Sequence, residues 1–536
     1  MSKPKNVDGQ RSNSGNYPDD CFLRLVTMII GTSAKTNVEA VSGGAVEGLP
    51  ALPAGVRQRS TADLYFVPEL MNLVGLSYAM RSQIKLKVLK ELLLQSECLE
   101  KMIHMQIQLL GTTNSGHVVL PYIFGYILPP VTLRFRRGEC DGGSQANWNG
   151  KIERYHMFSC VSIKCWVVLT TNKHLEITKV FVVDFMETAH AIGLHLPAVP
   201  NIIPIDGKNA YSYLHALDKI VNEIDPPIII VIMEKFDFDV YASIKRKLCI
   251  DLGVVSKMVS LKTLKTEKAS PLVKLAVQLN TKLGGMPWMV QIPTKGIIIV
   301  CISTYRETSD NNTAYGTLIA SLDDTYTRYY NFIESYDNVN NMTNCFADNL
   351  IIAALRYKKQ NGTLPASFLI YRAGLKDGQI PNTYILELKT IKARLTDFYD
   401  GKEPPMAFVL VQRRPNSKLF TYCSENEVID NVLPGTVVDF NNDIDTTTYD
   451  FLMVSRNATL GIEMPTYYVV IQDTLKNWSR DKMISLTYKL THMYFNRLCS
   501  CSTPAPCELA NKLGWFTSET LKGIRHPKLD ESLFYL

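Results

Sequence analysis

The chain has 536 residues, of which 46% are hydrophobic and 20% are charged. This length exceeds what one hydrophobic core serves, so we expect two or more domains, and the composition excludes fibrous and wholly disordered proteins. The formal net charge of +6, from 57 Lys and Arg against 51 Asp and Glu, permits a polyanionic partner without requiring one. Because no apolar run reaches the roughly 20 residues that span a bilayer, we expect a soluble protein with no membrane partner.

Cysteine usage points to a reducing compartment. The twelve cysteines are scattered along the chain, and the sequence shows no signal peptide. This pattern predicts free thiols and a cytoplasmic or nuclear location. Cys499, Cys501 and Cys507 form the one tight cluster, but no further Cys or His follows at ligand spacing, so we expect no zinc site.

The first 160 residues contain few sheet signals. Residues 1–60 are rich in Ser, Gly, Asn and Pro, which is typical of a disordered tail. Apolar residues recur at helical spacing over 86–110, which predicts one or two amphipathic helices. After Pro129 and Pro130, the basic segment 134–137 begins a strand-like stretch.

The next segment alternates between strands and helices. Residues 165–169 and 227–232 are short, uniformly apolar runs, the pattern of strands buried on both faces of a parallel sheet. Between them, residues 178–194 and 210–224 show helical periodicity. The alternation predicts an α/β layer of Rossmann-like character.

A second strand series follows, so we place a domain boundary near Pro293. Its elements are predicted in chain order as strand 296–302, helix 343–357, strand 367–371, strand 407–411 and helix 482–495.

Positive charge is concentrated ahead of that boundary. Between 245 and 282 there are nine basic residues against Asp251 and Glu267; the nine are Lys245, Arg246, Lys247, Lys257, Lys262, Lys265, Lys268, Lys274 and Lys282. Tyr241 and Lys245 are four residues apart on a predicted helix, as are Gln278 and Lys282, so each pair projects from one helical face. Ammonium and phenol groups suit a phosphate, and an aromatic ring can stack on a base.

Five short motifs carry a resemblance to a known family. The run QLNTKLGGMPW at 278–288 resembles the junction of the MID and PIWI domains in Piwi-branch Argonautes. In that family's order follow YRAGLKDGQ at 371–379, LTYKLTH at 486–492, PAPCELANKL at 504–513 and LFYL at 533–536. Upstream, FVPEL at 66–70 resembles the segment just after the PAZ domain.

The resemblance implies an α/β protein with a Rossmann-like MID domain and an RNase H-like PIWI domain behind a helical linker segment. It assigns 1–60 to a disordered tail, 61–160 to a PAZ remnant and second linker, 161–293 to MID and 294–536 to PIWI. The family's N-terminal domain and nearly all of its PAZ domain, which holds the guide's 3′ end, have no counterpart.

The resemblance also implies a pocket for a guide's 5′-phosphate. The family's Tyr, Lys, Gln and Lys correspond to Tyr241, Lys245, Lys257 and Lys282, so that a lysine stands in place of the family's Gln. The family further uses a metal ion at this phosphate, expected here as Mg²⁺ held by Gln278 and the terminal carboxylate of Leu536, since a hard cation prefers oxygen ligands.

By contrast, the family's cleavage site is degenerate in this sequence. Slicing Argonautes hold two Mg²⁺ ions with three acidic residues and a His or Asp, and the matching positions here are Ser303, Asn341, Ala373 and Asn511. Neutral side chains supply too little negative charge for a metal pair. The nearby acids Glu307, Asp348 and Asp377 are displaced and are interpreted as loop or surface charges; Gly374 and Gly378 are interpreted as turn residues, and His492 as a packing residue.

Three functions remain open. The preferred one is a Piwi-type silencing protein that binds a piRNA-like guide and a complementary target RNA, acts in germline transposon silencing with other silencing-pathway proteins, and does not cut. The alternatives are a guide-free interaction scaffold derived from a Piwi protein, and an active nuclease. We expect the protein in the cytoplasm, in the nucleus or in perinuclear granules.

Overall fold

The computed structural model describes residues 24–29, 122–123, 125–197, 200–264, 269–306, 314–336, 339–374, 380–413, 417–423, 428–439, 448–458, 461–476 and 478–536. The chain divides into two compact units. One comprises Met1–Gly125, Lys418–Asn431 and Leu460–Ile462, and the other comprises the rest. The helices predicted at 86–110 and the FVPEL segment lie outside the described residues.

The first unit contains a four-stranded sheet of order β17-β16-β1-β2. Its strands are β1 Arg24–Ile29, β2 Tyr122–Ile123, β16 Ser417–Cys423 and β17 Val428–Asn431. Strand β1 pairs antiparallel with β2 and lies within residues 1–60, the segment predicted to be a disordered tail. The sequence of β1, RLVTMI, is rich in the apolar residues that favour strands.

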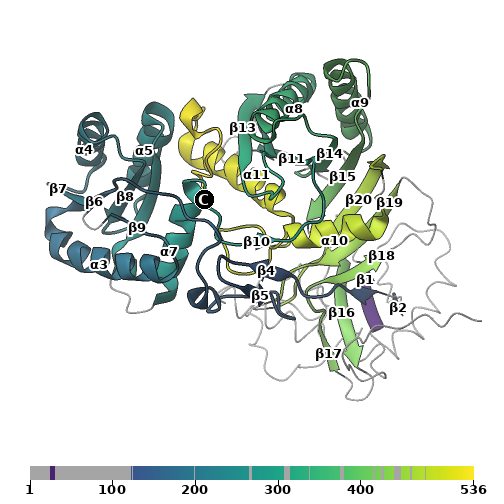
Figure 1. Cartoon of the computed structure of the whole chain (residues 1–536), viewed down its shortest axis with the longest axis horizontal. Helices are drawn as coiled ribbons and strands as arrows, with labels where there is room; N and C mark the ends of the chain where they lie inside the picture. The colour runs from purple at the N-terminus through teal and green to yellow at the C-terminus, as the bar shows by residue number, and fades with distance from the viewer. Residues whose placement is uncertain are drawn as a thin grey trace, which may run out of the picture. The chain divides into compact units, whose positions relative to one another are not determined.

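The second unit begins with a parallel sheet of order β7-β6-β8-β9. Its strands are β6 Val167–Thr171, β7 Asn201–Ile205, β8 Ile228–Met233 and β9 Val255–Ser260. The helices are α3 Leu175–Ala191, α4 Ala210–Glu223, α5 Phe238–Arg246, α6 Leu261–Leu264 and α7 Ala269–Lys282. Helices α3 and α7 cover one face of the sheet, while α4 and α5 cover the other (Figure 1).

The uniformly apolar strands follow from this double coverage. Val168 and Ile230 pack with Phe185 of α3 in one core, whereas Leu169 and Val231 pack with Leu217 of α4 in the other. Successive side chains of a strand point to opposite faces, so both sets must be apolar.

A nine-stranded mixed sheet follows, of order β13-β12-β11-β14-β15-β20-β19-β18-β3. Its strands are β3 Tyr126–Ile127, β11 Ile297–Arg306, β12 Ala314–Ser321, β13 Tyr329–Tyr336, β14 Ser367–Arg372, β15 Met406–Arg413, β18 Thr436–Asp439, β19 Tyr449–Val454 and β20 Thr466–Asp473. Helices α8 Val339–Asn361 and α9 Ile380–Phe398 lie on one face, and α10 Arg480–Leu490 and α11 Ala505–Phe516 contribute to the core on the other. The central strands β11, β14 and β15 are parallel.

Smaller elements complete this unit. A three-stranded sheet of order β10-β4-β5 joins Thr132–Arg134 (β4), Glu139–Asp141 (β5) and Met289–Val290 (β10). Short helical turns are Ile152–Arg154, Asn172–His174, Lys247–Leu252, Thr517–Leu521 and Pro527–Leu529. Among the helices that the structure describes, none has both the length and the apolar character to cross a membrane.

The predicted strands and helices of 165–411 are confirmed with small shifts of their ends. The helix predicted over 482–495 instead ends at Leu490, because the chain turns at Thr491, whose hydroxyl donates to Tyr488 O at 2.7 Å. The strand expected to begin at Arg134 lies earlier, at Thr132–Arg134. The boundary near Pro293 falls between α7 and β11 and stays a prediction.

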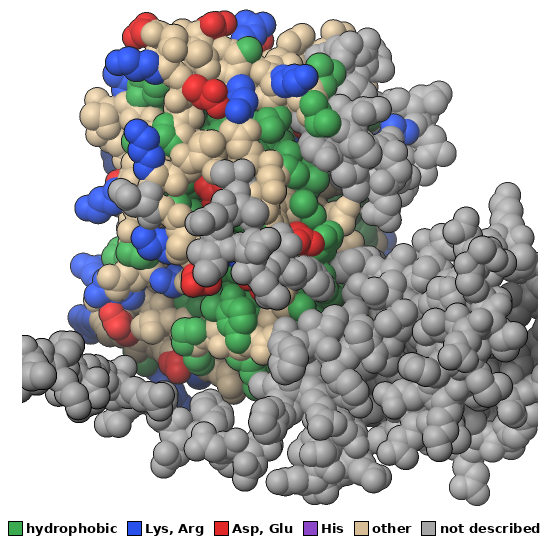
Figure 2. All heavy atoms as spheres, turned by 90° about the vertical axis from the view of Figure 1, so that its right-hand side faces the viewer, with side chains coloured by type: hydrophobic (Ala, Val, Ile, Leu, Met, Phe, Trp, Pro, Cys, Tyr) green, Lys and Arg blue, Asp and Glu red, His purple; other side chains and the backbone are tan. Residues whose placement is uncertain are grey.

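On the face of the molecule seen in Figure 2, Lys and Arg side chains are interspersed with Asp and Glu. Neither sign of charge dominates there.

Candidate nucleic-acid interface

A cavity of about 700 Å³ opens between α5, β9, α7 and α11. The chain's last residue lies in the same region, between α7 and α11 (Figure 1). All six residues predicted for the phosphate pocket line this cavity; they are Tyr241, Lys245, Lys257, Gln278, Lys282 and Leu536. The structure therefore brings together residues that are nearly 300 positions apart, while their role stays a prediction.

Helix α5 supplies Tyr241 and Lys245. Asp237 caps its start by accepting from the backbone N–H groups of Asp239 and Val240. Tyr241 and Lys245 are one turn apart and both face the cavity. Lys245 is buried, and its Nζ donates to Ser256 O at 3.2 Å and to Ser256 Oγ at 2.8 Å, which anchors it to β9.

A connected polar group joins β9 to α7. Lys257 Nζ of β9 donates to Oε1 of Gln278 on α7. Gln278 Nε2 in turn donates to Asn496 Oδ1 at 2.5 Å. The amide of Gln278 is thus held from both ends, with its oxygen towards the lysine.

Lys282 ends α7 inside the protein. Its side chain is 1% exposed, and its Nζ donates to the backbone oxygen of Phe534 at 2.5 Å. That bond holds the C-terminal segment against α7, which explains why Leu536 reaches the cavity.

Lys512 is a fourth lysine of the cavity that the sequence analysis did not assign to it. It lies on α11, with its Nζ 4.2 Å from the ring centre of Trp515. The signal that could have found it is its place inside the PAPCELANKL motif, three residues before an aromatic side chain. Lys274 also lines the cavity, but its side chain is exposed.

Burial and mutual repulsion destabilise the charged forms of these lysines. Burial is the main cause that lowers the pKa of Lys245, and that of Lys512. Burial, followed by the charges of Lys245 and Lys512, lowers the pKa of Lys257 to about 8. Burial, then Lys245 and Lys257, holds the pKa of Lys282 well below its ordinary value.

No Asp or Glu is among the described residues that line the cavity. Lys245, Lys257, Lys282 and Lys512, together with the exposed Lys274, therefore line a cavity whose one carboxylate is that of the chain terminus at Leu536. Fully buried lysines are rare unless they are paired with an opposite charge. This arrangement is chemically suited to an anion, and above all to a phosphate dianion that can accept several charged hydrogen bonds.

Aromatic side chains surround the mouth of the cavity. Phe236, Phe238 and Trp515 line it and are 65%, 44% and 39% exposed. Tyr241 is more buried, its ring centre lies 5.5 Å from that of Phe236, and burial raises its pKa to about 12. Exposed rings beside an anion site provide faces on which a base can stack.

Three of the four positions that the resemblance assigns to the cleavage site lie close together, on β11, just after β14 and on α11. Ser303 Oγ donates to Asn511 Oδ1 at 3.1 Å. The backbone N–H of Ala373 donates to Ile302 O at 2.8 Å, which places it beside Ser303 on the neighbouring strand. Gly374 has a φ of 79°, and a Cβ there would lie 2.6 Å from Thr304 O, so the turn requires glycine as predicted.

The fourth position and the nearby acids lie apart from these three. Asn341 is exposed in the first turns of α8. Asp348, also exposed on α8, lies 3.8 Å from Arg394 and is a surface charge as interpreted. Glu307, Asp377 and Gly378 lie outside the described residues.

His492 is a packing residue, as predicted, although it lies just beyond α10. It is 1% exposed, its Nδ1 lies 3.1 Å from Tyr488 O, and its ring stacks on Trp148 with centres 5.6 Å apart. Burial lowers its pKa to about 4.

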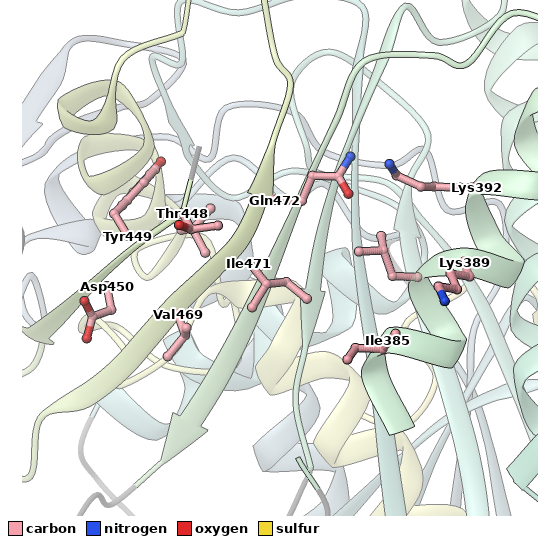
Figure 3. Close-up of a pocket in the computed structure, with 11 residues that line it drawn as sticks. Ile385, Lys389, Lys392, Thr448, Tyr449, Asp450, Val469, Ile471 and Gln472 are labelled. Atoms are coloured by element: carbon pink, nitrogen blue, oxygen red, sulfur yellow. The ribbon is translucent and has the colours of Figure 1, made fainter. Parts of the chain in front are cut away.

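A further hollow, of about 510 Å³, lies between α9 and strands β19 and β20. Its lining includes Ile385, Lys389 and Asp450, and the side chains of Lys392 and Gln472 point towards each other across it (Figure 3). Lys392 Nζ is also 2.9 Å from Glu403, and Asp450 accepts from Tyr467. In this hollow Lys392 thus pairs with a carboxylate, whereas no Asp or Glu is among the described residues that line the first cavity.

Known proteins share this architecture. The Piwi domain model matches residues 228–522. The chain is 28% identical to Piwi-like protein Siwi of Bombyx mori over 508 residues, which are 90% of this chain and 55% of that protein. It spans about half the length of the curated relatives it matches.

Solved structures agree. The crystal structure of Drosophila Piwi matches with a TM-score of 0.72 and 27% identity over 79% of this chain and 58% of that one. Kluyveromyces polysporus Argonaute, solved with a guide RNA, matches in fold with a TM-score of 0.67 and 16% identity over 78% of this chain and 54% of that one. The fold is the mixed α/β fold of the Argonaute MID and RNase H-like PIWI domains, and the chain belongs to the Piwi branch of the Argonaute family.

Proposed function

We propose that this protein binds the 5′-phosphorylated end of a short, piRNA-like guide RNA and silences complementary transcripts without cutting them. The observation that carries the proposal is the convergence of Lys245, Lys257, Lys282 and Lys512 on a cavity whose described lining has no acidic side chain. A terminal phosphate supplies the missing negative charge, and the exposed rings of Phe236 and the other aromatic residues accept the first bases.

Target choice follows from base pairing. In this family's architecture the protein holds the guide's backbone and end, and the guide supplies the sequence information. The Kluyveromyces polysporus protein with a similar fold was solved with a guide RNA, and the named relatives are Piwi proteins. We propose germline transposon silencing with recruited silencing-pathway proteins, in the cytoplasm, in the nucleus or in perinuclear granules.

The lack of cleavage rests on the chemistry of three positions. Ser303 and Asn511 are neutral and hydrogen-bond to each other, and Ala373 has no side-chain oxygen. Two divalent cations held close together need several carboxylates between them. Among the described residues no cluster of three or more His, Cys, Asp and Glu could hold a metal ion.

The test of guide binding is to sequence the RNA that co-purifies with the protein. We expect short RNAs with 5′-monophosphates, and we expect a Lys245→Ala/Lys282→Ala double variant to lose them. Wild-type protein that purifies free of small RNA would refute guide binding and favour the interaction scaffold.

Cleavage is tested with a fully paired labelled target and Mg²⁺. We expect the target to remain intact. A Mg²⁺-dependent product that is absent from a control preparation purified in the same way without this protein would refute this part of the proposal. It would indicate an active nuclease.

A further inference from the structure

The amide oxygen of Gln278 already has a cationic partner. Lys257 Nζ donates to it, while the amide nitrogen donates to Asn496 Oδ1 at 2.5 Å. An inverted amide would direct its N–H groups at the ammonium, so the network defines which atom faces Lys257. Gln278 is one of the two residues expected to hold Mg²⁺ at the guide's phosphate.

The residues present do not fit that ion. A hard divalent cation seeks oxygen ligands, and it binds best where several of them are anionic. Here the side-chain oxygen at the expected site accepts from an ammonium group, and Lys245, Lys282 and Lys512 line the same cavity. Among the described lining residues, only the chain terminus at Leu536 would offer the ion an anionic oxygen. A divalent cation would have to displace Lys257 and enter a site with four positive charges around it.

An ammonium group can fulfil the bridging role itself. It carries positive charge and three N–H donors, of which one is used on Gln278 Oε1. Lys257 also lines a cavity large enough for a phosphate, so the remaining donors are available to one. The group can thus hold Gln278 and a phosphate oxygen at the same time.

We propose that this chain recognises the guide's 5′-phosphate without a divalent cation, with the Lys257 ammonium in the place beside Gln278 where the family would hold Mg²⁺. The inference rests on the proposed guide binding and concerns how that same site neutralises the phosphate. It implies that affinity for a 5′-phosphorylated RNA does not depend on divalent ions.

The experiment measures binding of two RNAs of one sequence, with a 5′-phosphate and with a 5′-hydroxyl, to the RNA-free full chain by fluorescence anisotropy. Both are titrated in Mg²⁺ and in EDTA at constant ionic strength. We expect the preference for the 5′-phosphate to change less than about twofold between the two buffers, since no ion has to be bound.

The outcomes separate this inference from the function beneath it. A preference that EDTA reduces tenfold or more, and that Mg²⁺ restores, overturns the inference and leaves guide binding intact. A lack of preference in both buffers overturns the proposed function, and the inference with it.

A variant identifies the residue responsible. Lys257→Gln replaces the ammonium with a neutral amide and frees Gln278 Oε1. The preference of this variant for the 5′-phosphate over the 5′-hydroxyl should therefore fall in EDTA and recover in Mg²⁺. Lys262→Gln, an exposed residue of α6 outside the cavity, is the matched control for charge. Thermal melting curves check that both variants fold. If Lys257→Gln keeps an ion-independent preference equal to that of the wild type, Lys257 does not replace the metal.

Discussion

Replacing Lys282 by Met should separate phosphate recognition from folding. The Lys282 ammonium is 1% exposed, and its Nζ donates to Phe534 O at 2.5 Å. Burial, followed by the charges of Lys245 and Lys257, holds its pKa well below the ordinary value, so the charged form is costly in the free protein. Methionine fills similar space without the charge.

The expected loss of affinity follows from one charged hydrogen bond. Such a bond contributes about 1.5–3 kcal/mol, so 5′-phosphorylated RNA should bind about 10- to 150-fold more weakly. RNA with a 5′-hydroxyl lacks the phosphate and should bind as before. For folding, the unpaired oxygen of Phe534 costs about 1–3 kcal/mol, but removal of a buried ammonium offsets part of that cost.

The assay compares both RNAs by anisotropy and the RNA-free proteins by thermal denaturation. Lys179→Met is the control, since it removes one positive charge from an exposed side chain of α3 that pairs only with Glu176 in the described structure. Equal losses for the two RNAs, or a melting temperature that falls in step with affinity, would show that Lys282 acts through the fold and not through the phosphate.

Three further results are expected. The pKa of Lys257 is lowered to about 8, so its ammonium loses the proton above that pH. In anisotropy titrations, affinity for 5′-phosphorylated RNA should therefore fall about tenfold from pH 7 to pH 9. Affinity for 5′-hydroxyl RNA should show no such step. Lys512→Met should weaken phosphate binding by about 1 kcal/mol, less than Lys282→Met, because Lys512 is less buried. Lys512→Arg keeps the positive charge and should bind phosphate as the wild type does. Equal binding by the wild type, Lys512→Met and Lys512→Arg would contradict a role for this charge. A Ser303→Asp/Ala373→Asp variant should melt at a higher temperature in Mg²⁺ than in EDTA, unlike the wild type, and an unchanged melting temperature would contradict the view that carboxylates are what this site lacks.

The layers of the fold were predictable where the burial pattern is simple. Residues 228–233 are apolar without interruption because helices cover both faces of their sheet, and such runs indicate buried parallel strands. The end of α10 at Leu490 was not predictable, since residues 491–495 keep the apolar character of a helix but pack as a turn. Strand β1 was missed because its six residues lie within a long polar segment.

The grouping of these residues around one cavity was predictable through spacing and resemblance, but their contacts were not. Four-residue spacing placed Tyr241 and Lys245 on one face of α5, and the structure brings both to the cavity. Contacts between distant segments carry no local signal, so the sequence could not reveal that Lys257 donates to Gln278 or that Lys512 joins from α11. The ion expected at Gln278 was an inference from resemblance alone.

The positions assigned to cleavage and the lysine-lined cavity differ in how their polar groups are paired. At the positions that the resemblance assigns to cleavage, the neutral side chains of Ser303 and Asn511 hydrogen-bond to each other. At the cavity Lys245 and Lys282 are buried, and burial followed by the charge of Lys245 holds the pKa of Lys282 well below its ordinary value. Burial of such lysines without an anion destabilises the folded protein, and binding of an anion offsets that destabilisation. The proposal of guide binding therefore depends on the lysines of this cavity more than on the fold around it.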